Sequence, residues 1–135
     1  MSTNGYRTDE MTLRLPFAAA SVSVARQRLQ DWMRDAGAAR EAVEDARVVV
    51  SELVANSVRH AGPLSDGTIH VSWAASSGGI DVAVTDGGSR TRARHVQAPT
   101  SALAGRGMAI IEALAHEWWT ELGECRSTVH ALLKL

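Results

Sequence analysis

The spacing of the apolar residues marks three segments of the chain as helical. Between residues 19 and 36 they recur at intervals of three and four, as along one buried helix face, and Gly37 follows as a stop signal. In the second segment, Gly62 and Pro63 come soon after His60 and are expected to end the helix. The pattern predicts helices over residues 19–36, 38–60 and 107–117.

Other segments alternate apolar and polar residues, as half-buried strands do. Met11, Leu13 and Leu15 form one such segment, which Pro16 is expected to end as an edge strand. The two central segments are separated by Ser-Ser-Gly-Gly at 76–79, which predicts a hairpin loop. The predicted strands cover residues 11–15, 68–74, 80–85, 118–122 and 127–134.

The order of these elements predicts the fold class. Strands joined by hairpins favour a mixed or mostly antiparallel sheet, and their alternation leaves one sheet face buried and the other wet. We therefore expect an α+β fold, a two-layer sandwich with three helices on one face of the sheet. Residues 1–10 are expected to be a disordered tail and residues 11–135 a single domain. Residues 87–104 are polar, rich in Arg and interrupted by Gly and Pro, which predicts a long loop.

Composition narrows the class of protein only a little. A chain of 135 residues is about one domain, and 45% hydrophobic with 21% charged residues is ordinary for a soluble globular protein. A net charge of −1 argues against a general nucleic-acid binder, and no apolar run is long enough to predict a membrane span. Cys125 is the one cysteine, so no internal disulfide can form and a reducing cytoplasm fits best.

Candidate chemistry begins on the second predicted helix. Glu52, Asn56 and His60 are spaced by four residues, so they share one narrow polar stripe on a helix that is otherwise largely apolar. Amide and carboxylate oxygens suit Mg²⁺, and a carboxylate beside a metal-bound phosphate can act as a base or orient a nucleophile. On the pattern alone, a solvated stripe at a helix end is the favoured interpretation.

Two glycine-containing segments could approach a phosphate. Asp86 ends a hydrophobic strand and is followed by two glycines, and Gly-Arg-Gly at 105–107 opens the third helix. Glycine lets the backbone come close to a ligand, and a helix N-terminus offers unpaired N–H groups to an anion. Each segment taken alone could also be a simple turn.

In this order the three segments resemble the motifs of the GHKL ATPase superfamily, which includes gyrase, heat-shock chaperone ATPases, histidine kinases and mismatch-repair ATPases. The matching residues are Glu52 and Asn56 for the N box, Asp86 and Gly88 for the first glycine box, and Gly105 and Gly107 for the second. The segment 89–104 takes the place of the family's mobile ATP lid. Two stretches, SELVANSVRHAG and GRGMAIIEALAHEW, are similar to those of the small bacterial anti-sigma-factor serine/threonine kinases.

The resemblance implies a role for each matched residue. Glu52 would be the base or orienter for the attacking hydroxyl, and Asn56 would hold Mg²⁺ between the phosphates of ATP. Asp86 would accept a hydrogen bond from the adenine amino group, and Gly88 would leave room beside the base. The remaining expected contacts are Gly105, Arg106 and Gly107 with the phosphates and Thr128 with the base. His60 matches a histidine of the subfamily that has no implied role.

The implied protein is a cytoplasmic anti-sigma-factor-type serine/threonine kinase that uses ATP and Mg²⁺. It would bind a sigma factor and phosphorylate a STAS-type anti-anti-sigma partner, without direct contact with nucleic acid or membrane; homodimers are compatible with this. Arg90 stands where the first glycine box usually has its last glycine. That departure favours the alternative of a non-catalytic ATP-binding module that captures a partner. An adaptor without nucleotide binding is the third hypothesis.

Overall fold

The computed structural model describes residues 10–76, 78–88 and 106–134. Its sheet has five strands in the order β1-β2-β3-β5-β4, and every neighbouring pair is antiparallel. The strands are β1 (Glu10–Pro16), β2 (Thr68–Ser76), β3 (Gly79–Asp86), β4 (Glu117–Gly123) and β5 (Arg126–Lys134). The described helices are α1 (Ser21–Asp35), α2 (Arg40–His60) and α5 (Arg106–Leu114).

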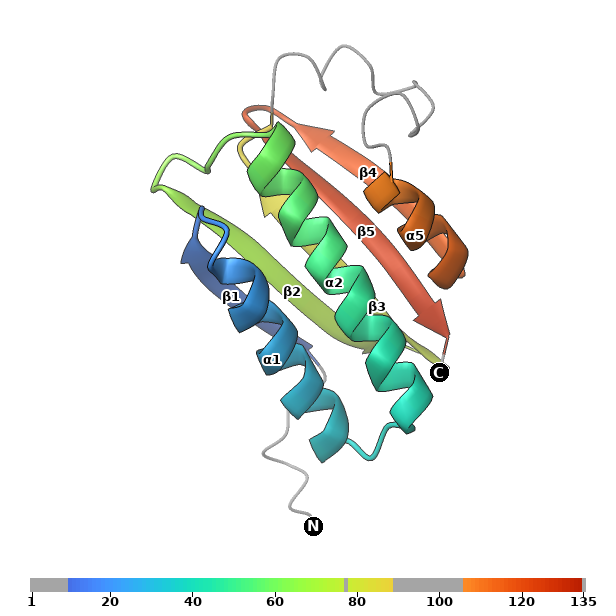
Figure 1. Cartoon of the computed structure of the whole chain (residues 1–135). Coiled ribbons are helices and arrows are strands. Elements are labelled where there is room, and N and C mark those ends of the chain that lie inside the picture. Colours follow the sequence, from blue (N-terminus) through green and yellow to red (C-terminus); the bar gives the residue numbers. More distant parts are fainter. Residues whose placement is uncertain (1–9, 77, 89–105, 135) are drawn as a thin grey trace.

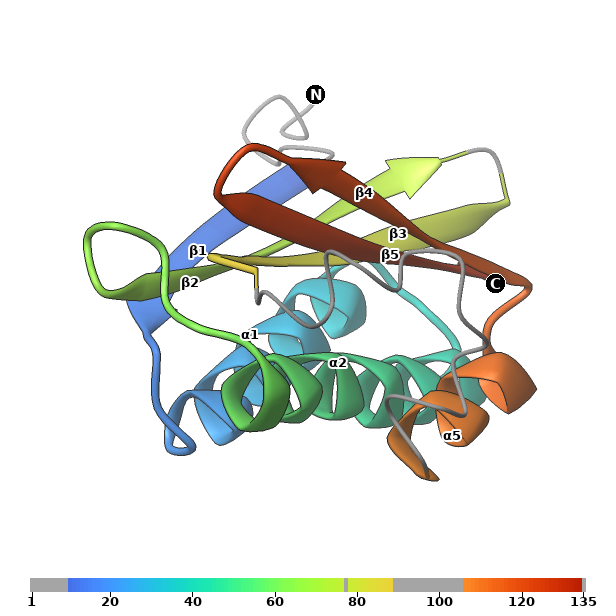
Figure 2. The ribbon, with the colours of Figure 1, turned by 90° about the horizontal axis from the view of Figure 1, so that it is seen from above.

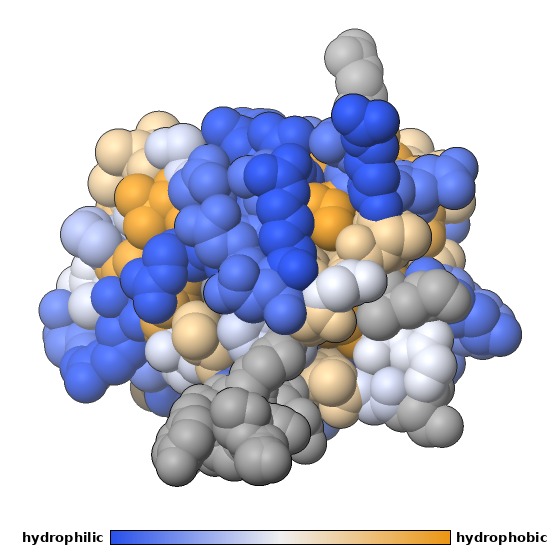
Figure 3. Space-filling view, turned by 90° about the horizontal axis from the view of Figure 1, so that it is seen from below, coloured by the Kyte–Doolittle hydropathy of each residue, from blue (hydrophilic) through white to orange (hydrophobic). Residues whose placement is uncertain are grey.

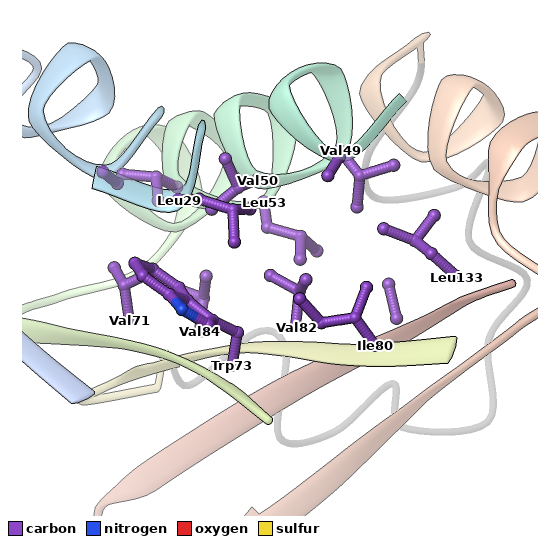
Figure 4. Packing of buried hydrophobic residues seen from close by; sticks show 14 of the residues in the cluster. Leu29, Val49, Val50, Leu53, Val71, Trp73, Ile80, Val82, Val84 and Leu133 are labelled. Atoms are coloured by element: carbon purple, nitrogen blue, oxygen red, sulfur yellow. The ribbon is translucent and has the colours of Figure 1, made fainter. Parts of the chain in front are cut away.

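All three described helices lie on one face of the sheet (Figures 1 and 2), so the predicted two-layer α+β sandwich is confirmed. The core fills the space between the layers. Figure 4 shows Val49, Val50 and Leu53 of α2 pointing toward the inner side chains of the strands. On β3 these are the alternate residues Ile80, Val82 and Val84, all at most 1% exposed. Burying one such side chain stabilises the fold by about 1.5–3 kcal/mol.

Gly37 ends α1 as the sequence predicted. Its φ is +83°, a conformation that glycine adopts without strain. Its N–H donates to Arg34 O over 2.9 Å, and the N–H of Ala38 donates to Met33 O over 3.0 Å. These two bonds satisfy carbonyls that the end of a helix otherwise leaves unpaired. The turn brings the chain back antiparallel so that α2 packs beside α1.

Several predicted boundaries were wrong. Glu10 belongs to β1 rather than to a tail, because it pairs with Ala74. The strand ladder reaches Ser76 and Gly79, which were predicted as loop. A Cβ on Gly79 would lie 2.5 Å from Leu133 O, so its lack of a side chain lets β5 approach. The third helix ends at Leu114, because the N–H of His116 already donates to β5 at Leu132 O.

The surface seen from below combines a broad hydrophilic band with smaller apolar patches on either side (Figure 3). The exposed large apolar side chains of the described residues are Val24, Val48, Ile110 and Leu122, each between 36% and 42% exposed. Scattered exposure of this kind is normal for folded proteins. No helix in the described part of the chain is long and apolar enough to cross a membrane.

Candidate functional site

Asn56 lies on the buried side of α2 and is only 8% exposed. Its Nδ2 donates to Sδ of Met108 on α5 over 3.3 Å. Its Oδ1 is buried, and no described residue donates a hydrogen bond to it. Leaving such an acceptor unpaired costs about 1–3 kcal/mol of folding free energy, so we expect a ligand or a water to donate to this atom or bind it. A carboxamide oxygen is a ligand that Mg²⁺ accepts, and this residue therefore fits the metal that the sequence motif implies.

Glu52 lies one helical turn before Asn56, about 6 Å along the axis on the same face. It is half-buried, whereas His60, one turn beyond Asn56, is exposed. The predicted polar stripe therefore passes from a half-buried carboxylate through a buried amide to an exposed imidazole. Among the described residues no ion pair engages Glu52, so its carboxylate is available to act on a neighbouring group.

Asp86 ends β3 as predicted and is completely buried. Oδ2 accepts a hydrogen bond from Ser57 Oγ over 2.5 Å, and Oδ1 accepts one from the Gly88 N–H over 2.7 Å. These donors fix the plane of the carboxylate. Sequence reasoning missed Ser57, because the predicted polar stripe contained only the three residues spaced by four along α2. The signal was present, since Ser57 is a polar residue at an otherwise apolar position beside Asn56.

A backbone clasp ties the end of α2 to the end of β3. The N–H of Gly87 donates to Gly62 O over 2.8 Å, and the N–H of Gly62 donates to Gly88 O over 3.1 Å. A Cβ on Gly87 would lie 2.0 Å from Pro63 O, so only glycine fits there. The clasp holds Asp86 against α2, which is why the two motifs meet although about 30 residues separate them.

On β5, the register separates Thr128 from Asp86. Thr128 pairs with Thr85, and their Oγ1 atoms are 2.7 Å apart. Successive strand residues point to opposite faces, and the buried Ser127 and Ala131 define the inner face. The Thr128 hydroxyl therefore lies on the outer face of the sheet. Ser127, which pairs directly with Asp86, is the β5 residue on the site's side.

The start of α5 completes what the structure describes of the predicted site. The helix begins at Arg106, and Gly107 lies in its first turn. Met108 and Ile111 of this helix are buried, and the helix packs against α2. Gly105 lies outside the described residues, as do Arg90 and the rest of the predicted lid, residues 89–104.

A hollow of about 420 Å³ lies elsewhere in the described structure. It is formed where the segment after α2 meets the turn between β4 and β5. It is lined by Pro63, Leu64, Ser65, Asp66, His70, Gly87, Glu124, Cys125 and Arg126. None of the predicted site residues lines it, but Gly87, which lies between Asp86 and Gly88, does, so the hollow borders the site at the end of β3.

Comparisons with known proteins agree with the motifs. A family model of the histidine kinase-like ATPase domain matches residues 15–130. Serine-protein kinase RsbW of Listeria monocytogenes is 33% identical over 118 residues, which covers 78% of this chain and 75% of that protein. RsbW of Staphylococcus aureus is 32% identical over 84 residues, covering 61% of this chain and 53% of that protein.

Two solved structures share the fold. The RsbU and RsbW domains of a Mycobacterium tuberculosis protein superpose with a TM-score of 0.73 at 24% identity, covering 95% of this chain and 32% of that one. The SiaB–SiaC complex of Pseudomonas aeruginosa gives a TM-score of 0.71 at 15% identity, covering 96% and 93%. The match to the family model and the identity to the RsbW relatives show the family. The chain belongs to the histidine kinase-like ATPase domain family and is related to the RsbW serine-protein kinases.

Proposed function

We propose that this protein is a cytoplasmic, ATP-dependent serine/threonine kinase of the anti-sigma-factor type. It would bind a sigma factor and phosphorylate a STAS-type anti-anti-sigma partner. The observation that carries the proposal is the buried Oδ1 of Asn56, which has no donor among the described residues and follows Glu52 by one turn. The relatives named serine-protein kinase support the same activity.

The residues of this chain would bind and orient the nucleotide. Asp86 would accept a hydrogen bond from the adenine amino group, and Gly88 would leave room beside the base. Ser127, paired with Asp86, replaces Thr128 as the proposed β5 contact, because it lies on the inner face. Asn56 Oδ1 would hold Mg²⁺, which neutralises charge on the phosphates. The second glycine box, residues 105–107, would offer N–H groups to the phosphates at the start of α5.

Glu52 would orient the attacking hydroxyl of the partner and take its proton. The serine or threonine oxygen forms a bond to the γ-phosphorus as the bond from that phosphorus to the β–γ bridging oxygen breaks. The products are the phosphorylated partner and ADP. A carboxylate in this role needs to be unpaired and close to the phosphates, and the half-buried Glu52 one turn from Asn56 meets the first condition among the described residues.

Transfer of labelled γ-phosphate from ATP to a STAS-type protein from the same genome tests the proposal. Glu52→Gln should slow transfer by about 100-fold or more, since a positioned base contributes about 10²–10⁴. ATP binding by this variant should be unchanged. Transfer by Glu52→Gln at the rate of the unmodified protein would show that Glu52 is not the base.

The second candidate function is a non-catalytic regulator that binds ATP and captures a partner. Arg90 in place of the last glycine of the first box favours it. It predicts nucleotide binding with no phosphate transfer to any STAS-type protein. An adaptor that has lost nucleotide binding predicts neither. The same two measurements, binding and transfer, therefore separate all three functions.

A further inference from the structure

The hydrogen bond between Asn56 and Met108 can form in only one orientation of the Asn56 amide. A carboxamide has an oxygen that only accepts hydrogen bonds and an NH₂ group that only donates them, and the two ends are nearly the same size. The thioether sulfur of methionine is a weak acceptor and carries no proton to donate. The structure pairs Sδ of Met108 with Nδ2 of Asn56 over 3.3 Å. Reversing the amide would place two acceptors against each other.

The packing around Met108 fixes its position, so that its sulfur can determine the orientation of the Asn56 amide. It is 6% exposed and lies two residues after the start of α5, which packs against α2. The same helix buries Ile111 completely, so α5 is anchored one turn further along. On the other side of the amide, Oδ1 is buried and no described residue donates to it. Met108 is therefore the one described hydrogen-bond partner that distinguishes the two ends of this carboxamide.

We infer that Met108 is a positioning residue for the cation site: it keeps Asn56 oriented with Oδ1, rather than Nδ2, as the end that meets Mg²⁺. The inference rests on the proposed function, because it needs Asn56 to hold the cation. A divalent cation requires an oxygen lone pair and is repelled by the NH₂ group. When both orientations are populated, the apparent affinity falls by the fraction of molecules in the wrong one.

A nuclear magnetic resonance experiment on the ligand-free full chain tests the orientation by itself. The ε-methyl group of Met108 should show an Overhauser contact with the side-chain NH₂ protons of Asn56. The Met108→Leu variant identifies the methyl signal. Met33, buried on α1, provides an internal comparison that should show no such contact. Absence of the contact from Met108 would overturn the inference whatever the protein does with nucleotide.

Calorimetric ATP titrations with and without Mg²⁺ test the consequence. Leucine is close to methionine in volume, so Met108→Leu should fold, but it removes the acceptor. The gain in ATP affinity on adding Mg²⁺ should be about two- to tenfold smaller in this variant, with affinity in chelator unchanged. Met33→Leu, the matched control, should keep the full gain.

The outcomes separate this inference from the proposed function. Full Mg²⁺ dependence in Met108→Leu, with ATP bound normally, would overturn the positioning role and leave the kinase proposal standing. If the unmodified protein bound no nucleotide, the kinase proposal would fail and the positioning role would fail with it, even with the Overhauser contact present. A reduced Mg²⁺ gain confined to Met108→Leu supports both.

Discussion

Ser57 on α2 donates a hydrogen bond over 2.5 Å to Oδ2 of Asp86 at the end of β3. Both side chains are buried, at 3% and 0% exposure. Ser57 follows Asn56 directly, so neighbouring residues of one helix serve the proposed metal site and the proposed adenine contact. The orientation of the Asp86 carboxylate is therefore coupled to the position of α2.

Ser57→Ala should lower both stability and nucleotide affinity. The change removes a donor from a buried carboxylate, and a hydrogen bond to a charged group contributes about 1.5–3 kcal/mol. Denaturant unfolding should show a loss of that size, and ATP should bind more weakly because Asp86 is less well oriented. The matched control is Ser51→Ala, also on α2, whose hydroxyl is only half-buried and contacts Arg26 and Arg47 O. An equal loss of stability and ATP affinity in both variants would show that the hydrogen bond to Asp86 contributes no more than that of Ser51.

Gly87→Ala should disrupt the clasp between α2 and β3. The new Cβ would lie 2.0 Å from Pro63 O, and a backbone atom cannot move aside without breaking the two clasp hydrogen bonds. We expect a loss of about 1–3 kcal/mol in the free energy of unfolding. Gly62→Ala is the control, because its Cβ would meet Gly88 O at an ordinary 3.7 Å. Similar stability of both variants would contradict the steric account.

The stability of the segment after α2 should depend on acid pH through Asp66. Hydrogen bonds from the Thr68 side chain and then from Arg14 lower the pKa of Asp66 to about 2, from 3.8. Folding therefore favours the ionised carboxylate. Its contribution is complete above about pH 4 and is lost as the pH falls through 2. Unfolding measured across this window should be less pH-dependent in Asp66→Asn. If the unfolding free energy of Asp66→Asn changed with pH as steeply as that of the unmodified protein, Asp66 would not be a source of the pH dependence.

Ser127→Ala should weaken ATP binding more than Thr128→Ala does. Ser127 pairs with Asp86 on the inner face, whereas the Thr128 hydroxyl contacts Thr85 on the outer face. Loss of one hydrogen bond to the base corresponds to about a three- to tenfold weaker affinity. Titration of both variants with ATP measures the difference. The reverse order would return the contact to Thr128.

Periodicity was sufficient to predict the three helices, the five strands and the layer arrangement, because each element buries one face. It also placed Glu52 and Asn56 on one stripe of α2. The apolar pattern does not predict which residues pair across neighbouring strands. A shift of one residue in this register moves a strand side chain to the other face of the sheet. Thr128 was expected to contact the base because of the family resemblance, whereas the observed register pairs Ser127 with Asp86.

The apolar pattern also could not predict side-chain contacts between elements that are distant in sequence. No prediction for Met108 was made from the sequence, and its sulfur contact with Asn56 follows from how α5 packs on α2. The Ser57–Asp86 bond likewise depends on the clasp at Gly62 and Gly87. The roles of the second glycine box and of Arg90 rest on the motif, since Gly105 and Arg90 lie outside the described residues.

The central claim is that Asn56 belongs to a Mg-ATP site, and the melting temperature with and without Mg-ATP tests it most directly. A ligand that binds only the folded state stabilises it by about 2.7 kcal/mol at a hundredfold excess over its dissociation constant. We predict a clear rise in melting temperature for the unmodified protein and little or none for Asn56→Ala. No rise at millimolar Mg-ATP, or an equal rise in the variant, would contradict the account.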